Sequence, residues 1–221
     1  MGRALVIGAS GGIGAALCEE FRARGEEVTG LSRRKDGLDV TDEASISFAF
    51  SKLSGAYDIV VIAIGALEID GAVPEKTLRA LTPEAMMDQF RLNAVGPALL
   101  LKHLVPLLPR NRRAVVGVLS ARVGSIGDNR LGGWYSYRAS KAAVNQLVHT
   151  VAIELARSHK QLICVALHPG TVATAFTQKY LGRHPAVTPS AAAHNLVNTI
   201  NALTHDQTGG FFDYSGAEVP W

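Results

Sequence analysis

A tyrosine and a lysine stand four positions apart in the second half of the chain, at Tyr137 and Lys141. On a helix this spacing puts both side chains on one face. A phenol has a reference pKa of about 10, and a neighbouring ammonium favours its phenolate form, so the pair can move a proton beside a hydride transfer. Tyr135 lacks this help, because its fourth neighbour is Ala139. The spacing alone is typical of an amphipathic helix, so the chemistry depends on a cofactor site elsewhere in the chain.

A glycine-rich turn near the N-terminus is the predicted cofactor site. The apolar run 4–7 leads into Gly8-Ala-Ser-Gly-Gly12-Ile-Gly14, and a helical pattern follows at once. Glycines let the backbone approach a pyrophosphate, and the start of the helix offers N–H groups to it. The same letters match the G-x-S-x-G elbow of hydrolases, but the strands that precede such an elbow have no room before Gly8. We therefore predict dinucleotide binding by Gly8, Ser10, Gly11, Gly12, Ile13 and Gly14.

The end of the second predicted strand, 28–32, bears on the choice of dinucleotide. An acidic residue there would accept hydrogen bonds from the ribose 2′-hydroxyl of NAD. This chain has Ser32-Arg33-Arg34 instead, with no carboxylate to repel a 2′-phosphate and with an arginine that can clamp it. We expect Ser32 and Arg33 to bind NADP(H).

Composition and charge narrow the class of protein. The 221 residues are 48% hydrophobic, which suits one α/β domain over 1–221. The 22 basic and 19 acidic residues leave a net charge of +3 and are spread along the chain, so no nucleic-acid partner is expected. No run reaches the roughly 18 apolar residues of a membrane span. The seven histidines form no metal-binding pattern, and Cys18 and Cys164, in segments that read as buried, suit a reducing cytoplasm.

Short apolar runs alternate with helical patterns along the whole chain, which is typical of a three-layer, doubly wound parallel sheet, the Rossmann fold. We predict strands at 4–7, 28–32, 38–40, 59–64, 115–119, 162–167 and 211–214. We predict helices at 13–24, 44–53, 87–104 and 140–158, with another starting at Thr188-Pro189. No internal repeat or linker interrupts this order.

With Tyr137-Arg-Ala-Ser-Lys141 added to the glycine turn, the chain resembles the short-chain dehydrogenase/reductase family over nearly its whole length. Leu38-Asp39-Val40-Thr41, Asn93 in a long helix, and Pro169-Gly170-Thr171-Val172-Ala173-Thr174 after a strand occur in the family's order. Gly124-Ser125-Ile126 is similar to the C-factor-like branch of small carbonyl reductases. The resemblance implies further cofactor contacts from Asp39, Val40, Ala63, Gly65, Tyr137, Lys141, Pro169, Gly170, Val172 and Thr174.

The resemblance also implies roles for some of these residues. Asp39 would contact adenine, Val172 and Thr174 would hold the nicotinamide and pyrophosphate, and Lys141 would bond the nicotinamide ribose. One departure follows the strand at 59–64, where the family has Asn-Ala-Gly and this chain has Ala63-Ile64-Gly65. The glycine beside the cofactor remains, but the asparagine that supports the central strand is missing.

The resemblance implies that Asn93 holds a water connecting Lys141 to solvent. Its alternative role is that of a polar helix residue at a kink before Pro97. We favour the first.

The serine that polarises the substrate oxygen in the family is not matched directly. A residue aligned through Gly124 falls on Ala121, so the hydroxyl comes from Ser120 or Ser125 or is absent. Side-chain alternation at the strand end could turn Ser120 away from Tyr137, whereas Ser125 lies in a loop that could fold back. We prefer Ser120.

These residues predict an oxidoreductase that interconverts a ketone or aldehyde and an alcohol with NADP(H), using Tyr137, Lys141, Asn93 and Ser120. The alternative is an NADPH-binding sensor or signalling protein with little turnover. The segments 66–81, 123–134 and 176–184 are predicted to line the substrate pocket, with Leu67, Trp134, Phe176 and Tyr180 making it apolar and a large charged substrate less favoured. Apolar surface on 87–104 and 140–158 favours a homodimer or homotetramer.

Overall fold

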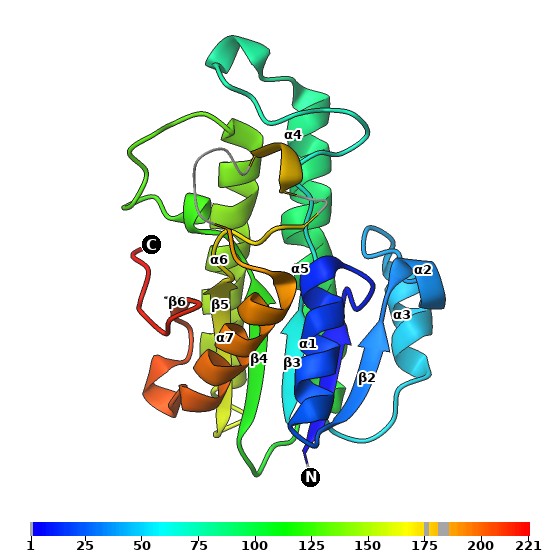
Figure 1. Ribbon diagram of the computed structural model, residues 1–221. Helices are drawn as coiled ribbons and strands as arrows, with labels where there is room; N and C mark the ends of the chain where they lie inside the picture. The colour runs from blue at the N-terminus through cyan, green and yellow to red at the C-terminus, as the bar shows by residue number, and fades with distance from the viewer. Residues whose placement is uncertain (1, 175–176, 181–185) are drawn as a thin grey trace.

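Runs of aliphatic residues form six parallel strands in the computed structural model, which describes residues 2–174, 177–180 and 186–221. The strands lie in the order β2-β1-β3-β4-β5-β6 (Figure 1). Most of their side chains are buried on both faces, as expected for a parallel sheet covered by helices. The bounds are β1 Arg3–Ile7, β2 Glu27–Leu31, β3 Ile59–Ile62, β4 Ala114–Leu119, β5 Leu162–His168 and β6 Phe211–Asp213.

Helices cover both faces of this sheet (Figure 1). One face packs on α1 (Gly12–Ala23) and α7 (Pro189–Ala202), and the other on α3 (Glu43–Ser51), α5 (Gly96–Leu104) and α6 (Tyr135–Leu155). Two further helices, α2 (Arg33–Asp36) and α4 (Pro83–Phe90), lie at the carboxyl edge of the strands. The predicted doubly wound Rossmann fold is confirmed.

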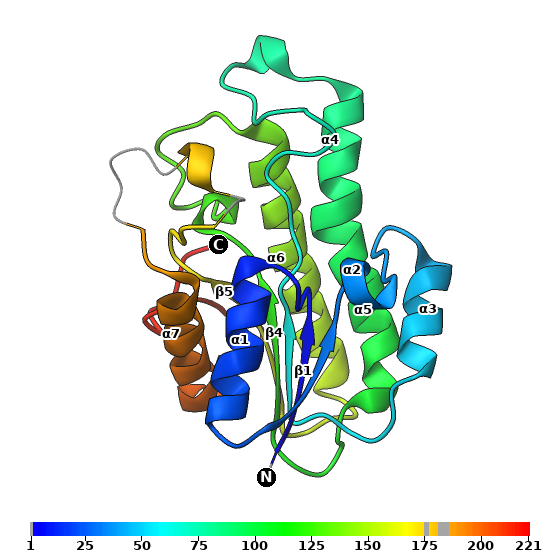
Figure 2. The same cartoon turned by 45° about the vertical axis from the view of Figure 1, so that its right-hand side comes forward.

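The carboxyl ends of the strands meet along one edge of the sheet. Leu31 and Ile62 both pair with the last residue of β1, and Leu119 pairs with Leu167. The glycine turn, the segment after β3 and the segment after β4 therefore start side by side. In Figure 2, α4 and the first turns of α6 extend beyond this edge of the sheet.

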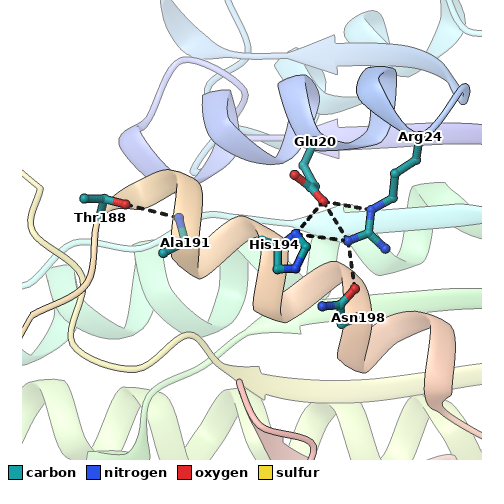
Figure 3. A network of polar contacts seen from close by, with 6 residues as sticks. All are labelled: Glu20, Arg24, Thr188, Ala191, His194 and Asn198. Atoms are coloured by element: carbon teal, nitrogen blue, oxygen red, sulfur yellow. Dashed lines mark hydrogen bonds and ion pairs between the residues drawn. The ribbon is translucent and has the colours of Figure 1, made fainter.

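A polar network joins α1 to α7 (Figure 3). Arg24 Nε donates to Glu20 Oε1 at 2.8 Å, and Arg24 Nη2 donates to Asn198 Oδ1 at 2.7 Å. His194 Nδ1 lies 3.0 Å from the same Glu20 oxygen. The hydrogen bond from Arg24 is the main reason that the pKa of Glu20 is lowered. Ala191 N–H donates to the Thr188 side chain, so the first turn of α7 is capped.

The predicted strand at 38–40 is wrong. Leu38 and Val40 are buried in the core as expected, but their backbone forms no ladder. The chain instead enters α2 after β2, and Asp39 N–H donates to Ser45 Oγ of α3 at 2.9 Å. The local hydrogen-bond partners of this segment thus replace a strand neighbour, and β2 remains the edge.

The predicted helix 87–104 starts earlier, at Pro83, and is interrupted. Thr82 caps α4, and a π-helical turn over Arg91–Val95 separates α4 from α5. Pro97 follows this turn and has no N–H to continue the regular ladder, which accounts for a local widening at this point. The helix predicted from 140 likewise begins earlier, at Tyr135.

The two cysteines occupy the elements expected for them. Cys18 is buried in α1 and Cys164 in β5, and both are free thiols. Complete burial raises the pKa of Cys164 to about 12, so this thiol stays protonated and inert. Within the described ranges, no helix is both long and apolar enough to cross a membrane.

Candidate active site

A cavity of about 860 Å³ opens at the carboxyl edge of the sheet. Its wall combines the glycine turn with segments that follow β3, β4 and β5 and with the start of α6. Many of the predicted site residues meet in this wall: Ser10, Gly11, Gly12, Ile13, Gly14, Ala63, Gly65, Ser120, Tyr137, Lys141, Pro169, Gly170, Val172 and Thr174. Residues from five separate stretches of chain therefore share one cavity.

The glycine turn is packed so closely at Gly8 and Gly14 that a side chain has no room at either position. Gly8 has φ 94°, and a Cβ on it would lie 2.9 Å from the Ala63 carbonyl carbon. A Cβ on Gly14 would lie 2.8 Å from the carbonyl carbon of Gly8. Helix α1 has Gly11 at its N-cap and no side chain that caps it, so its first N–H groups remain available. This is a suitable cradle for a pyrophosphate.

A carboxylate that the sequence analysis did not predict lies beside the end of β2. Asp36 Oδ2 accepts hydrogen bonds from Ser32 N–H at 2.7 Å and from Ser32 Oγ at 3.2 Å, because α2 folds Asp36 back onto its own N-cap. The hydroxyl and N–H of Ser32 are thus already occupied. Arg33 remains exposed beside them. Of this pair, Arg33 is the residue free to meet a 2′-phosphate.

Asp39 and Val40 lie behind this corner, outside the cavity wall. Asp39 Oδ1 accepts from both the N–H (2.9 Å) and the hydroxyl (2.7 Å) of Thr41. These bonds are the largest cause of its lowered pKa, and the positive charges of Arg33 and Arg91 add to it. The Val40 side chain is buried in the core. A cofactor could therefore meet the Val40 backbone but not its side chain.

Tyr137 and Lys141 lie on the first turns of α6, and only 6% and 3% of their surfaces are exposed. Lys141 Nζ donates to the carbonyl oxygen of Leu119 at 3.0 Å and lies 5.9 Å from the centroid of the Tyr137 ring. Burial raises the pKa of Tyr137 and lowers that of Lys141 to about 8. The expected lowering of the tyrosine pKa by the ammonium is therefore outweighed by burial here.

Asn93 connects the π-helical turn to the segment after β3. Its Oδ1 accepts from Ala66 N–H at 2.8 Å, and its Nδ2 donates to the Ala66 carbonyl at 2.9 Å. A Cβ on Gly65 would lie 3.1 Å from both Asn93 Oδ1 and Lys141 Nζ. Gln89, one turn earlier, donates to the Leu67 carbonyl at 2.9 Å. Asn93 and Gln89 thus hold the segment after β3, in which the family's usual asparagine is missing.

The two candidate serines occupy different environments. Ser120 lines the cavity, and its Oγ points toward α6, 3.5 Å from the Lys141 carbonyl oxygen. Ser125 is absent from the cavity wall among the described residues, and its hydroxyl donates to the Pro220 carbonyl. Ala121, at the position aligned with the family serine, also lines the cavity. The geometry thus favours Ser120 over Ser125 as a group that can reach a substrate.

An aromatic group forms part of the predicted substrate wall. The Trp134 ring lies edge-to-face with Tyr137 at a centroid distance of 6.3 Å and with Tyr180 at 5.6 Å. The backbone N–H of Trp134 donates to the backbone carbonyl of Glu75 at 2.5 Å. The buried Glu75 carboxylate accepts from the backbone N–H and the hydroxyl of Ser136. This carboxylate at the start of α6 explains why the helix begins before Ser140.

The substrate side of the cavity wall carries charge as well as apolar side chains. Leu67, Trp134 and Tyr180 line the cavity as expected, while Phe176 and positions 181–184 lie outside the described residues. Four charged residues join them: Arg122, Asp128, Arg130 and Arg138. The predicted apolar pocket is therefore incomplete. The sequence does not show which charged side chains of a loop point into the cavity, because that depends on how the loop folds. His168 also lines the cavity, and burial lowers its pKa to about 4.

Over 2–174, 177–180 and 186–221, no group of three histidine, cysteine or acidic side chains is arranged to hold a metal ion.

A phosphate cradle and a buried tyrosine–lysine pair in one wall of a Rossmann fold define a nucleotide-binding α/β protein. The chain matches the short chain dehydrogenase family over residues 3–183. It is 32% identical, over the whole of both chains, to 1-hydroxy-2-glutathionyl-2-methyl-3-butene dehydrogenase of Rhodococcus sp. (strain AD45). It is 34% identical to the C-signal of Myxococcus xanthus, over 62% of this chain and 78% of that one.

A solved structure gives the same result. A short-chain dehydrogenase/reductase from Burkholderia multivorans with bound NADP superposes with a TM-score of 0.86 at 28% identity, covering 100% of this chain and 99% of that one. The chain therefore belongs to the short-chain dehydrogenase family, and its similarity to C-signal agrees with the C-factor-like features of the sequence.

Proposed function

We propose that the protein is an NADP(H)-dependent oxidoreductase that interconverts a carbonyl compound and an alcohol. The observation that carries this proposal is the shared cavity wall, which contains the glycine turn at one end and the buried Tyr137 and Lys141 at the other. A phosphate cradle alone would serve any nucleotide-binding protein. A phenol with a buried ammonium beside it adds a group for moving a proton.

The residues present fit a nicotinamide dinucleotide. The glycines at positions 8 and 14 let the turn pack against neighbouring backbone, and the uncapped start of α1 has N–H groups that would bind a pyrophosphate. The relative from Burkholderia multivorans binds NADP. The exposed Arg33 supports the same choice, because a guanidinium can form paired hydrogen bonds with a 2′-phosphate. Asp36, bonded to Ser32, makes Arg33 the main determinant of that preference.

The proposed chemistry assigns one task to each side chain. The cofactor, when bound, supplies or accepts the hydride at the substrate carbon. Tyr137 donates its proton to the substrate oxygen, and the burial that raises its pKa keeps this phenol protonated beforehand. Lys141 places a positive charge 5.9 Å from the ring centroid and stabilises the phenolate that remains.

Two further residues position or polarise the reacting groups in this proposal. Ser120 gives up its long, 3.5 Å hydrogen bond to the Lys141 carbonyl and donates to the substrate oxygen, replacing the hydroxyl that Ala121 lacks. Asn93 holds Gly65 and Ala66 beside Lys141 through its paired bonds to the Ala66 backbone. We also propose that Asn93 holds a water that connects Lys141 to solvent.

The test compares two tyrosines on the same helix. Tyr137→Phe removes the phenol that lines the cavity, while Tyr135→Phe removes a phenol from a partly exposed position outside it. We expect the first variant to keep NADPH affinity and to lose about 10³-fold in kcat on a panel of ketones and aldehydes, and the second to keep both. Equal rates for the wild type and Tyr137→Phe would refute the proposed mechanism.

Ala121 favours a second candidate, an NADPH-binding sensor or signalling protein on the same fold. Its methyl group lies in the cavity wall where the family has a catalytic serine, and a relative is named C-signal. The same panel separates the two functions. Tight NADPH binding without any turnover that depends on Tyr137 would identify the sensor.

A further inference from the structure

The charges in the cavity wall beyond Tyr137 are unbalanced. The wall of the described cavity contains the guanidinium groups of Arg122, Arg130 and Arg138 as well as the buried Lys141. Only one carboxylate, that of Asp128, belongs to the same wall in the described residues. All three arginines come from the segment after β4 and the start of α6, on the substrate side.

Two carboxylates near these arginines, those of Asp128 and Asp213, both contact the same arginine. Arg122 Nε donates to Asp128 Oδ2 at 2.5 Å, and Arg122 Nη1 lies 3.7 Å from Asp213 Oδ2. Asp213 Oδ1 in turn accepts bonds from the backbone and hydroxyl of Ser215. Asp128 and Asp213 therefore neutralise Arg122 and leave nothing for the other two guanidinium groups.

Arg138 and Arg130 bond only to neutral groups among the described residues. Arg138 Nε donates to the Gly133 carbonyl at 2.9 Å, and its Nη1 donates to the Val123 carbonyl at 3.2 Å. Arg130 Nη1 has one long contact, 3.4 Å, with the carbonyl of Asn129. No carboxylate of the described chain lies within ion-pair distance of either.

A partly buried cation without an anion is costly, and here burial lowers the pKa of Arg138 below its ordinary value. The cofactor's pyrophosphate does not supply that anion, because its cradle follows β1, and β3 separates β1 from β4 in the sheet. A cleft lined by one sign of charge attracts ligands of the other sign. Apolar side chains, such as Leu67, Leu131 and Trp134, line the same cavity as these arginines.

We propose that the outer end of the cavity binds a carboxylate of the substrate through Arg130 and Arg138, so the preferred substrates are carbonyl compounds with an acidic group beyond an apolar spacer. This inference rests on the proposed function and adds its substrate class. A planar guanidinium can hold a carboxylate by two parallel hydrogen bonds. The apolar walls contact the spacer, and Tyr137 meets the carbonyl.

The test uses acids matched to their neutral esters. The probes are 4-carboxybenzaldehyde and 9-oxononanoic acid, each beside its methyl ester, which cover a short and a long spacer. We expect kcat/KM of the wild type to favour at least one acid over its ester by about tenfold, and added salt to reduce this preference. Arg130→Gln should lower kcat/KM for the acid to about that of its ester and so remove the preference.

Two controls isolate the charge. Arg110→Gln removes a charge from an exposed loop at the opposite edge of the sheet and should leave the preference intact. Arg130→Lys should retain part of it, since the positive charge remains. Arg138→Gln tests the second arginine, with ester turnover reporting whether its loop stays in place.

Failure of this inference is distinct from failure of the proposed function. Turnover of acids and esters at equal rates would overturn the carboxylate site and leave the oxidoreductase intact. If no carbonyl is reduced, calorimetry with 4-methylbenzoate and 4-methylbenzamide decides the matter. Binding of the benzoate alone, lost in Arg130→Gln, would support the anion site without catalysis, whereas equal or absent binding of both would overturn it.

Discussion

The two ends of the cavity are built by different means. The nucleotide end is made of backbone, with Gly8 and Gly14 packed too closely for any Cβ. The substrate end is a loop held by long side chains and by distant segments. Arg138 donates to carbonyls of that loop, and the Ser125 hydroxyl reaches the Pro220 carbonyl.

This difference decides how each end tolerates change. At the nucleotide end the neighbours are carbonyl groups of the backbone, which cannot move aside without opening the turn. At the substrate end each bond is one of several, and Gly127 N–H adds another to the carbonyl of Trp221. We expect single substitutions to be severe at the first end and graded at the second.

The largest effect should come from Gly14→Ala. The new methyl group would overlap the Gly8 carbonyl, so the turn must open, and we expect a loss of about 3 kcal/mol in unfolding free energy together with loss of NADPH binding. Gly11→Ala is the matched control for stability, because its Cβ would meet Gly8 O at an ordinary 3.4 Å. Urea unfolding and cofactor titration measure both. Equal stability of the two variants would contradict a backbone-limited turn.

Lys141→Met should change both turnover and the pH dependence of stability. Burial lowers the Lys141 pKa from 10.5 to about 8, so between these values the unfolded chain binds a proton that the folded chain does not. The stability contribution of Lys141 therefore rises with pH across this window, by up to about 3 kcal/mol. The difference between wild type and Lys141→Met in urea unfolding should rise from pH 8 to pH 10.

Lys160→Met, which removes a lysine from an exposed site, is the matched control for the loss of a positive charge. We also expect Lys141→Met to lower kcat about 10²-fold, because the phenolate loses its cation. A flat pH profile for Lys141→Met would mean that this ammonium is hydrated in the folded protein.

Arg33→Ala should weaken NADPH binding about tenfold, or roughly 1.4 kcal/mol, and leave NADH binding unchanged, because only the 2′-phosphate needs the guanidinium. Fluorescence titration with both cofactors measures this. Arg110→Ala provides the control for a general loss of charge. Tighter NADH than NADPH binding in the wild type would exclude NADP(H) as the preferred cofactor.

The smallest effect should come from Ser125→Ala. Loss of its bond to Pro220 should cost about 1 kcal/mol of stability, with kcat close to normal, because the hydroxyl points away from the cavity. Ser120→Ala should show the reverse, with unchanged stability and a kcat lowered at least tenfold. Thermal unfolding and NADPH oxidation separate the two. Normal rates in both variants would remove serine from the mechanism.

Local spacing predicted much of this molecule. The strand–glycine–helix order led to the cofactor end, and the Tyr137–Lys141 spacing led to one face of α6. The error at 38–40 arose because buried apolar residues such as Leu38 and Val40 can fill a core without belonging to a strand. Periodicity reports burial and does not report which backbone lies alongside.

By itself, the sequence determined the fold class, because strand and helix patterns alternate along the whole chain. It also determined the glycine turn and the paired tyrosine and lysine, because each depends on residues within a few positions of one another. Only the tertiary structure decided that Asp36 accepts the hydrogen bonds of Ser32 and that Ser120, not Ser125, lines the cavity. It also decided that Arg130 and Arg138 share a wall whose one carboxylate among the described residues, Asp128, is bonded to Arg122 instead. The Ser32–Asp36 bond is local but depends on how α2 folds back after β2. The cavity wall depends on segments far apart in the chain, whose side chains acquire burial and shifted pKa values only when the sheet brings them together.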